Sequence, residues 1–175
     1  MAVLFCSPRL YAPDLVVPDT SPQKHLLIVY HTMGGSTESM AQAVYQGATD
    51  PLIEGVDVRF KRAFDAGDDD LLWAHALILG TPENFGYMSG AMKDFLDRTF
   101  YPVEGKIQPL PYAMFISAGN DGQGALTAIR RIAKGYPFTE VQEPVVARGG
   151  VEQAHLDACR DLGMALAAGL EAGIY

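Results

Sequence analysis

LLIVYHTMGGSTESMAQAVY, residues 26–45, is the stretch that decides the fold. Its first five residues form an unbroken apolar run, which is typical of a strand buried on both faces of a parallel sheet. Met40 and Val44 then recur at helical spacing. Ser36 and Thr37 are expected to cap this helix, and an acidic residue follows in its first turn. The stretch therefore predicts a strand, a tight turn and a helix.

The turn itself, residues 32–37, has the composition of a phosphate site. It holds two glycines, which let a ligand approach the backbone, and three hydroxyl side chains. Backbone N–H groups at a helix N-terminus lack intrahelical partners, and the helix dipole favours an anion there. No Lys or Arg lies in the turn, so dipoles and hydroxyls would hold the anion. It is neither a P-loop nor a G-x-G-x-x-G motif, and an ordinary well-capped turn is the alternative.

Composition excludes several classes of protein. The 175 residues suffice for one domain with a full core, and with 49% hydrophobic and 19% charged residues the chain is globular. The formal net charge of −8 argues against a nucleic-acid or anionic-membrane partner. No apolar run approaches the roughly 20 residues of a membrane span, and residues 1–6 make a poor signal peptide. Cys6 and Cys159 suggest no disulfide framework, so a cytoplasmic location is expected.

Strands alternate with helices along the rest of the chain. Further apolar runs predict strands at residues 56–60, 76–79, 112–117 and 144–147. This alternation predicts an α/β fold, a flavodoxin-like three-layer sandwich with a five-stranded parallel sheet of order 2-1-3-4-5. In that order the loops that begin at His31, Gly80 and Ser117 converge on one crevice at the carboxyl ends of the central strands.

Residues 1–24 are expected to form an extended N-terminal arm ahead of a domain at residues 25–175. Four prolines interrupt this segment, which nevertheless carries seven large apolar residues between Leu4 and Val17. The arm is expected to pack on a second subunit, in a dimer or larger homo-oligomer. Packing on its own domain and a disordered leader are the alternatives.

Metal binding is not expected. Three consecutive acids, residues 68–70, precede an apolar stretch, where a helix N-terminus favours negative charge. The four histidines are scattered, and His155 with Cys159 gives only two ligands on one helix face.

Two stretches carry a resemblance to a known family. They are T-x-x-G-x-T-E-S-M-A at residues 32–41 and G-T-P-E-N-F-G-Y-M-S-G-x-M-K-x-F-L-D-R at residues 80–98. Both resemble the flavodoxin-like superfamily, and more closely the NAD(P)H-dependent FMN reductases and the tryptophan-repressor-binding-protein type of quinone oxidoreductase. The resemblance covers residues 25 to about 172 and includes a looser match at residues 117–124.

The resemblance implies a set of FMN-binding residues. The phosphate would be held by Thr32, Met33, Gly34, Gly35, Ser36 and Thr37. The isoalloxazine and ribityl chain would be lined by Pro82, Glu83, Asn84, Phe85, Gly86 and Tyr87. The other side would be closed by Ser117, Ala118, Gly119, Asn120 and Gly122. Plain packing is the alternative for Phe85 and Tyr87, and a surface turn is the alternative for Glu83.

The resemblance also implies a reaction. NAD(P)H would pass hydride to FMN, and a quinone or similar small molecule would then take the electrons, with no catalytic side chain required. A flavodoxin-like electron carrier with a protein partner is the alternative. A receiver domain of similar topology would need acidic residues where His31 and Thr32 stand.

Overall fold

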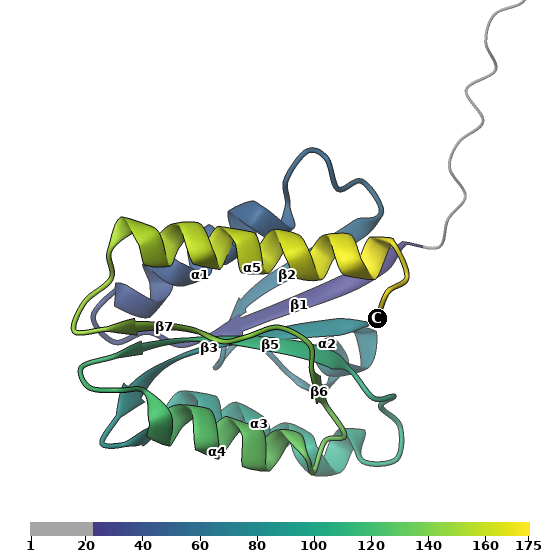
Figure 1. Cartoon of the computed structure of the whole chain (residues 1–175). Helices are drawn as coiled ribbons and strands as arrows, with labels where there is room; N and C mark the ends of the chain where they lie inside the picture. Colours follow the sequence, from purple (N-terminus) through teal and green to yellow (C-terminus); the bar gives the residue numbers. More distant parts are fainter. Residues whose placement is uncertain (1–22) are drawn as a thin grey trace, which may run out of the picture.

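The computed structural model describes residues 23–175, and its centre is a mainly parallel sheet (Figure 1). β1 (Lys24–Tyr30) lies between β2 (Val56–Arg62) and β3 (Ala76–Asn84). β3 pairs in turn with β5 (Pro111–Ala118), and all three pairings are parallel. β1 is thus a central strand, as its continuous apolar run predicts.

The far edge of the sheet is split between two short strands. β6 (Thr139–Glu140) pairs with the start of β5, and β7 (Val145–Arg148) pairs with its end. β4 (Tyr87–Met88) forms an antiparallel hairpin with the end of β3. The predicted fold is confirmed, but β4 and β6 add two strands to the five expected. Two residues are too few to produce an alternating pattern in the sequence, which is why neither strand was foreseen.

Helices cover both faces of the sheet, as the three-layer prediction requires. α1 (Ser36–Ala48) and α5 (Gln153–Glu171) lie on one face (Figure 1). The other face carries α2 (Asp68–Trp73), α3 (Gly90–Val103) and α4 (Gln123–Ala133).

Each face of the sheet has its own apolar core. Leu26 and Ile28 pack with α1 and α5, whereas Leu27 and Val29 pack with the helices of the other face. All four side chains are completely buried, because successive residues of a strand point to opposite faces.

Helix α1 begins differently from the expectation. Its N-cap is Gly35, with φ of 92°, and no side chain caps the helix. Ser36 is already the first helical residue, and Thr37 is buried and bonded elsewhere. The expected Ser/Thr cap was therefore wrong, because glycine takes the left-handed conformation that this turn needs.

The acids at residues 68–70 start α2, in agreement with the capping interpretation. The Asp70 carboxylate accepts a hydrogen bond from the Gly67 N–H at 2.9 Å and from Arg59 at 2.9 Å. Lys61 adds a second cation 2.8 Å from the same carboxylate. No group of His, Cys, Asp and Glu side chains in the described part of the chain could hold a metal ion.

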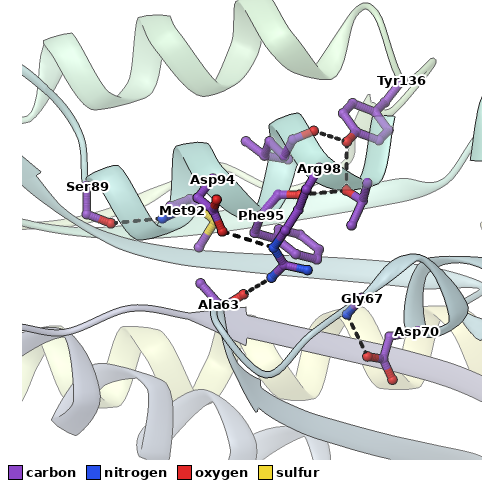
Figure 2. Close-up of polar contacts among 11 residues, drawn as sticks. Ala63, Gly67, Asp70, Ser89, Met92, Asp94, Phe95, Arg98 and Tyr136 are labelled. Atoms are coloured by element: carbon purple, nitrogen blue, oxygen red, sulfur yellow. Dashed lines mark hydrogen bonds and ion pairs between the residues drawn. The ribbon is translucent and has the colours of Figure 1, made fainter. Parts of the chain in front are cut away.

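Helix α3 is held by side-chain bonds at both ends (Figure 2). The Ser89 hydroxyl caps it by accepting from the Met92 N–H, and Arg98 pairs with Asp94 while donating to the Ala63 carbonyl. The Tyr136 hydroxyl reaches α3 from beyond α4. These bonds fix α3 directly after the β3–β4 hairpin.

Two glycines let α1 and α5 approach closely. A Cβ added to Gly47 would lie 1.9 Å from the Arg160 carbonyl oxygen, and one added to Gly163 would lie 2.0 Å from that of Val44. The two helix backbones therefore touch where any side chain would keep them apart.

The predicted arm lies almost entirely outside the described residues, although β1 already begins at Lys24. Among the helices that the structure describes, none is both long and apolar enough to cross a membrane.

Candidate functional site

A pocket of about 350 Å³ opens where β1, β3, β5 and β7 end. Eleven of the seventeen predicted site residues line it: Thr32, Met33, Gly34, Ser36, Thr37, Pro82, Glu83, Asn84, Ser117, Ala118 and Gly119. The three loops converge because parallel strands end at one edge of the sheet.

The predicted phosphate loop, residues 32–37, borders this pocket and leads into the first turn of α1. The Thr32 hydroxyl accepts from the Gly35 N–H at 3.0 Å and so fixes the turn. The N–H groups of Ser36, Thr37 and Glu38 have no acceptor within residues 23–175. Free N–H groups and the positive end of a helix dipole are features that favour an anion, as the sequence predicts for this turn.

In the described part of the chain, the charged side chains around the phosphate loop point away from it or are absent, so an anion there would be held by dipoles and hydroxyls. No Lys or Arg of residues 23–175 lines the pocket. Glu38 pairs with Arg62 at 2.9 Å, so its carboxylate is directed toward β2. Burial and then the charge of Arg62 lower the pKa of His31, which keeps this imidazole neutral beside the loop.

A pair of hydroxyls joins the phosphate loop to the third loop, which begins at Ser117. Thr37 Oγ1 lies 2.8 Å from Ser117 Oγ, and the Thr37 side chain is buried. This bond fixes the first turn of α1 against the end of β5.

The second loop, predicted to begin at Gly80, is in fact the end of β3, a two-residue turn and β4, because the strand continues to Asn84. Its residues separate at the tip of this hairpin. Asn84 donates to the Met33 sulfur at 3.3 Å and connects this loop to the phosphate loop. Phe85, with φ of 52°, is completely exposed at the tip and does not line the pocket. Gly86 and Tyr87 instead line a neighbouring groove with α4, together with Arg131. The β4 turn thus carries these three residues out of the predicted wall.

Glu83 has a more specific place than a surface turn. Its carboxylate accepts from the backbone N–H groups of Gly122 at 3.2 Å, Gly124 at 2.9 Å and Ala125 at 3.2 Å. A residue of the second loop therefore closes the N-terminus of α4.

The third loop contributes its first three residues to the pocket. Asn120 is exposed and Gly122 is the N-cap of α4, with φ of 75°, so neither lines it. Gly35 is likewise absent from the lining but forms the turn.

The sequence reasoning missed a fourth wall, at the end of β7 and in the residues after it. It consists of Ala147, Gly149, Gly150 and Val151. The signal was available, since a Gly-Gly pair follows the predicted fifth strand after one residue, and the carboxyl end of that strand reaches the same edge.

Tyr136 lies in the core beneath α4 and not at the pocket (Figure 2). Its hydroxyl bonds the Leu96 carbonyl and lies 2.8 Å from Thr99 Oγ1. Burial raises its pKa to about 12, so the phenol stays protonated.

The three-layer fold, with its pocket at the switch point of the strand order, defines the flavodoxin-like class. Comparison with known proteins identifies the family within this class. The family model described as NADPH-dependent FMN reductase matches residues 53–153, more than half of the chain. The chain belongs to this family, as its sequence motifs predicted.

Individual relatives agree with this assignment. A flavodoxin of Aquifex aeolicus (strain VF5) is 33% identical over 158 residues, 81% of this chain and 84% of that protein. An NAD(P)H dehydrogenase (quinone) of Acidithiobacillus ferrooxidans is 32% identical over 123 residues, 59% of this chain and 62% of the relative. Among solved structures, a flavodoxin from the domain Archaea superposes with a TM-score of 0.73 at 25% identity, covering 84% of this chain and 99% of the other.

Proposed function

We propose that the protein binds FMN and transfers electrons from NAD(P)H through it to a quinone or similar small acceptor. The observation that carries this proposal is the phosphate loop, whose free N–H groups at Ser36, Thr37 and Glu38 meet a hydroxyl-rich pocket. An anion with three acceptor oxygens could accept from these successive N–H groups of the first helical turn.

The rest of the pocket suits the remainder of the cofactor. Its volume of about 350 Å³ lies within the range of small-molecule sites. Residues 82–84 on one side and 117–119 on the other would line the ring and ribityl chain, with residues 149–151 as a further wall.

When bound, FMN would supply the hydride-accepting and electron-donating chemistry. The chain's own residues would bind and orient it. Among the described residues, the only titratable side chain that lines the pocket is that of Glu83, and it accepts from three backbone N–H groups. The reaction would therefore proceed without a side-chain acid or base.

A second candidate function is that of an electron carrier with a protein partner. It is favoured by the greater coverage of the flavodoxin relative and by the net charge of −8, which suits docking to a basic partner. A carrier would hold the same cofactor but would not oxidise NADPH by itself.

The two functions are separated by assaying the purified protein. Its visible spectrum and the flavin released on denaturation identify the cofactor. Oxidation of NADPH with a soluble quinone supports the reductase. FMN without NADPH or NADH oxidation favours the carrier, and an apoprotein that binds FMN no better than riboflavin refutes the phosphate site.

A further inference from the structure

Two helix N-termini lie near the pocket: α1 begins in its lining, and α4 is joined to it through Glu83. The two differ in whether their first N–H groups have an acceptor. At α1 the N–H groups of residues 36–38 have no acceptor within the described chain. At α4 every N–H from residue 122 to residue 125 has one. Asp121 accepts from Gln123 at 3.0 Å, and Glu83 accepts the other three.

The Glu83 carboxylate comes from a distant part of the chain. It reaches α4 from the end of β3, about forty residues earlier, since α4 has no cap from its own N-cap residue. Asp121 is local and belongs to the exposed loop before α4, outside the pocket lining. Of the two carboxylates, only that of Glu83 borders the pocket.

The backbone leaves no room for these elements to slide. A Cβ on Gly124 would lie 1.9 Å from the Gly86 carbonyl oxygen, so the first turn of α4 touches the β3–β4 hairpin directly. The contact and the three hydrogen bonds of Glu83 join the second and third loops into one unit.

We propose that Glu83 is a positioning residue that sets the direction in which the cofactor lies in the pocket. Its carboxylate closes the N-terminus of α4 from the ring end, which leaves the N-terminus of α1 as the place where a phosphate binds. The same carboxylate holds the third loop against the second loop, so that both ring walls keep their spacing. This proposal rests on the proposed FMN function and extends it by assigning the residue that orients the cofactor.

The test compares Glu83→Gln with Asp121→Asn, which removes a charge from the same helix end outside the pocket. The glutamine oxygen still accepts, but its NH₂ group would face the Gly122 N–H as a second donor. In apoprotein, amide exchange at Gly122, Gly124 and Ala125 should accelerate at least tenfold in Glu83→Gln and stay unchanged in Asp121→Asn. This readout requires no flavin, and thermal melts verify that both variants fold.

Flavin titrations then test the positioning role. Glu83→Gln should weaken binding of FMN and riboflavin by the same factor, about tenfold, because both ligands share the ring end. The midpoint potential of bound FMN should become less negative, since a carboxylate beside the ring disfavours added electrons. Asp121→Asn should change neither property.

Three outcomes would overturn the proposal: unchanged exchange at the three amides, unchanged flavin affinity and potential, or a loss confined to FMN. The last would place Glu83 at the phosphate end. A wild-type protein that binds no flavin would refute the proposed function, while the exchange measurement would still decide whether Glu83 holds α4.

Discussion

Replacing Gly163 by alanine should destabilise the protein even though alanine is the better helix former. A methyl group there would lie 2.0 Å from the Val44 carbonyl oxygen, whereas ordinary contact begins near 3.4 Å, so α1 and α5 must separate by about 1.4 Å. The higher helix propensity of alanine stabilises the folded protein by about 1 kcal/mol. Overpacking costs about 1–3 kcal/mol, and the separation also loosens the core around Val44. We expect a net loss of about 1–2 kcal/mol, or about 2–8 °C in Tm for a chain of this size.

Urea denaturation of apoprotein measures this loss, and Gly90→Ala is its matched control. Gly90 is also helical, but a Cβ there meets nothing within 4 Å, so alanine should stabilise by about 0.4–1 kcal/mol. Adding Gly47→Ala to Gly163→Ala should cost less than the sum of the two, because the helices have already moved apart. A Gly163→Ala protein as stable as wild type would refute the close-contact argument.

Other perturbations probe the phosphate loop, the α2 cap and the arm. Gly35→Ala should lose about 1–2 kcal/mol of folding stability, because φ of Gly35 is 92°. Gly34→Ala should fold normally but bind FMN more weakly, because Gly34 lines the pocket. Equal effects of the two substitutions in thermal melts and in flavin titrations would contradict this. The Asp70 carboxyl has its pKa held below 3.8: burial opposes ionisation, but hydrogen bonds from two β2 cations and the Gly67 N–H outweigh it. Its stabilisation is therefore present above about pH 4 and lost as pH falls through the lowered pKa, so Asp70→Asn should cost about 1–3 kcal/mol at pH 7 and flatten the acid limb of a pH series. A chain that begins at Gln23 should sediment as a smaller species if the arm joins subunits, and unchanged mass with unchanged NADPH oxidation would show the arm to be dispensable.

The layers and strand order could be predicted because they depend on patterns many residues long. The run at residues 26–30 requires a strand covered on both faces, and Leu26 and Leu27 do pack into different cores. The convergence of three loops follows from parallel pairing alone, which is why eleven predicted residues line the pocket.

The errors concern single residues whose backbone conformation or partner is not local. Gly35 caps α1 through a positive φ, although serine and threonine follow it and are usual capping residues. Phe85 takes a positive φ at a hairpin tip, where glycine or asparagine is the usual choice, so only its neighbour Gly86 signals the turn. The partners of Glu83 lie about forty residues away, at a distance that no short pattern encodes.

The contact between α1 and α5 has a consequence for synthesis of the protein on the ribosome. The phosphate loop lies near the start of the described chain, yet α1 packs against α5, the last helix that the structure describes. β1 likewise pairs with β3, which is made later, and residues 149–151 can form a wall only after β7 has been made. Each of these distant pairings costs loop-closure entropy, and all of them must form before the pocket exists. A nascent chain therefore has no assembled pocket before β7 and residues 149–151 have been synthesised and have packed against the earlier strands.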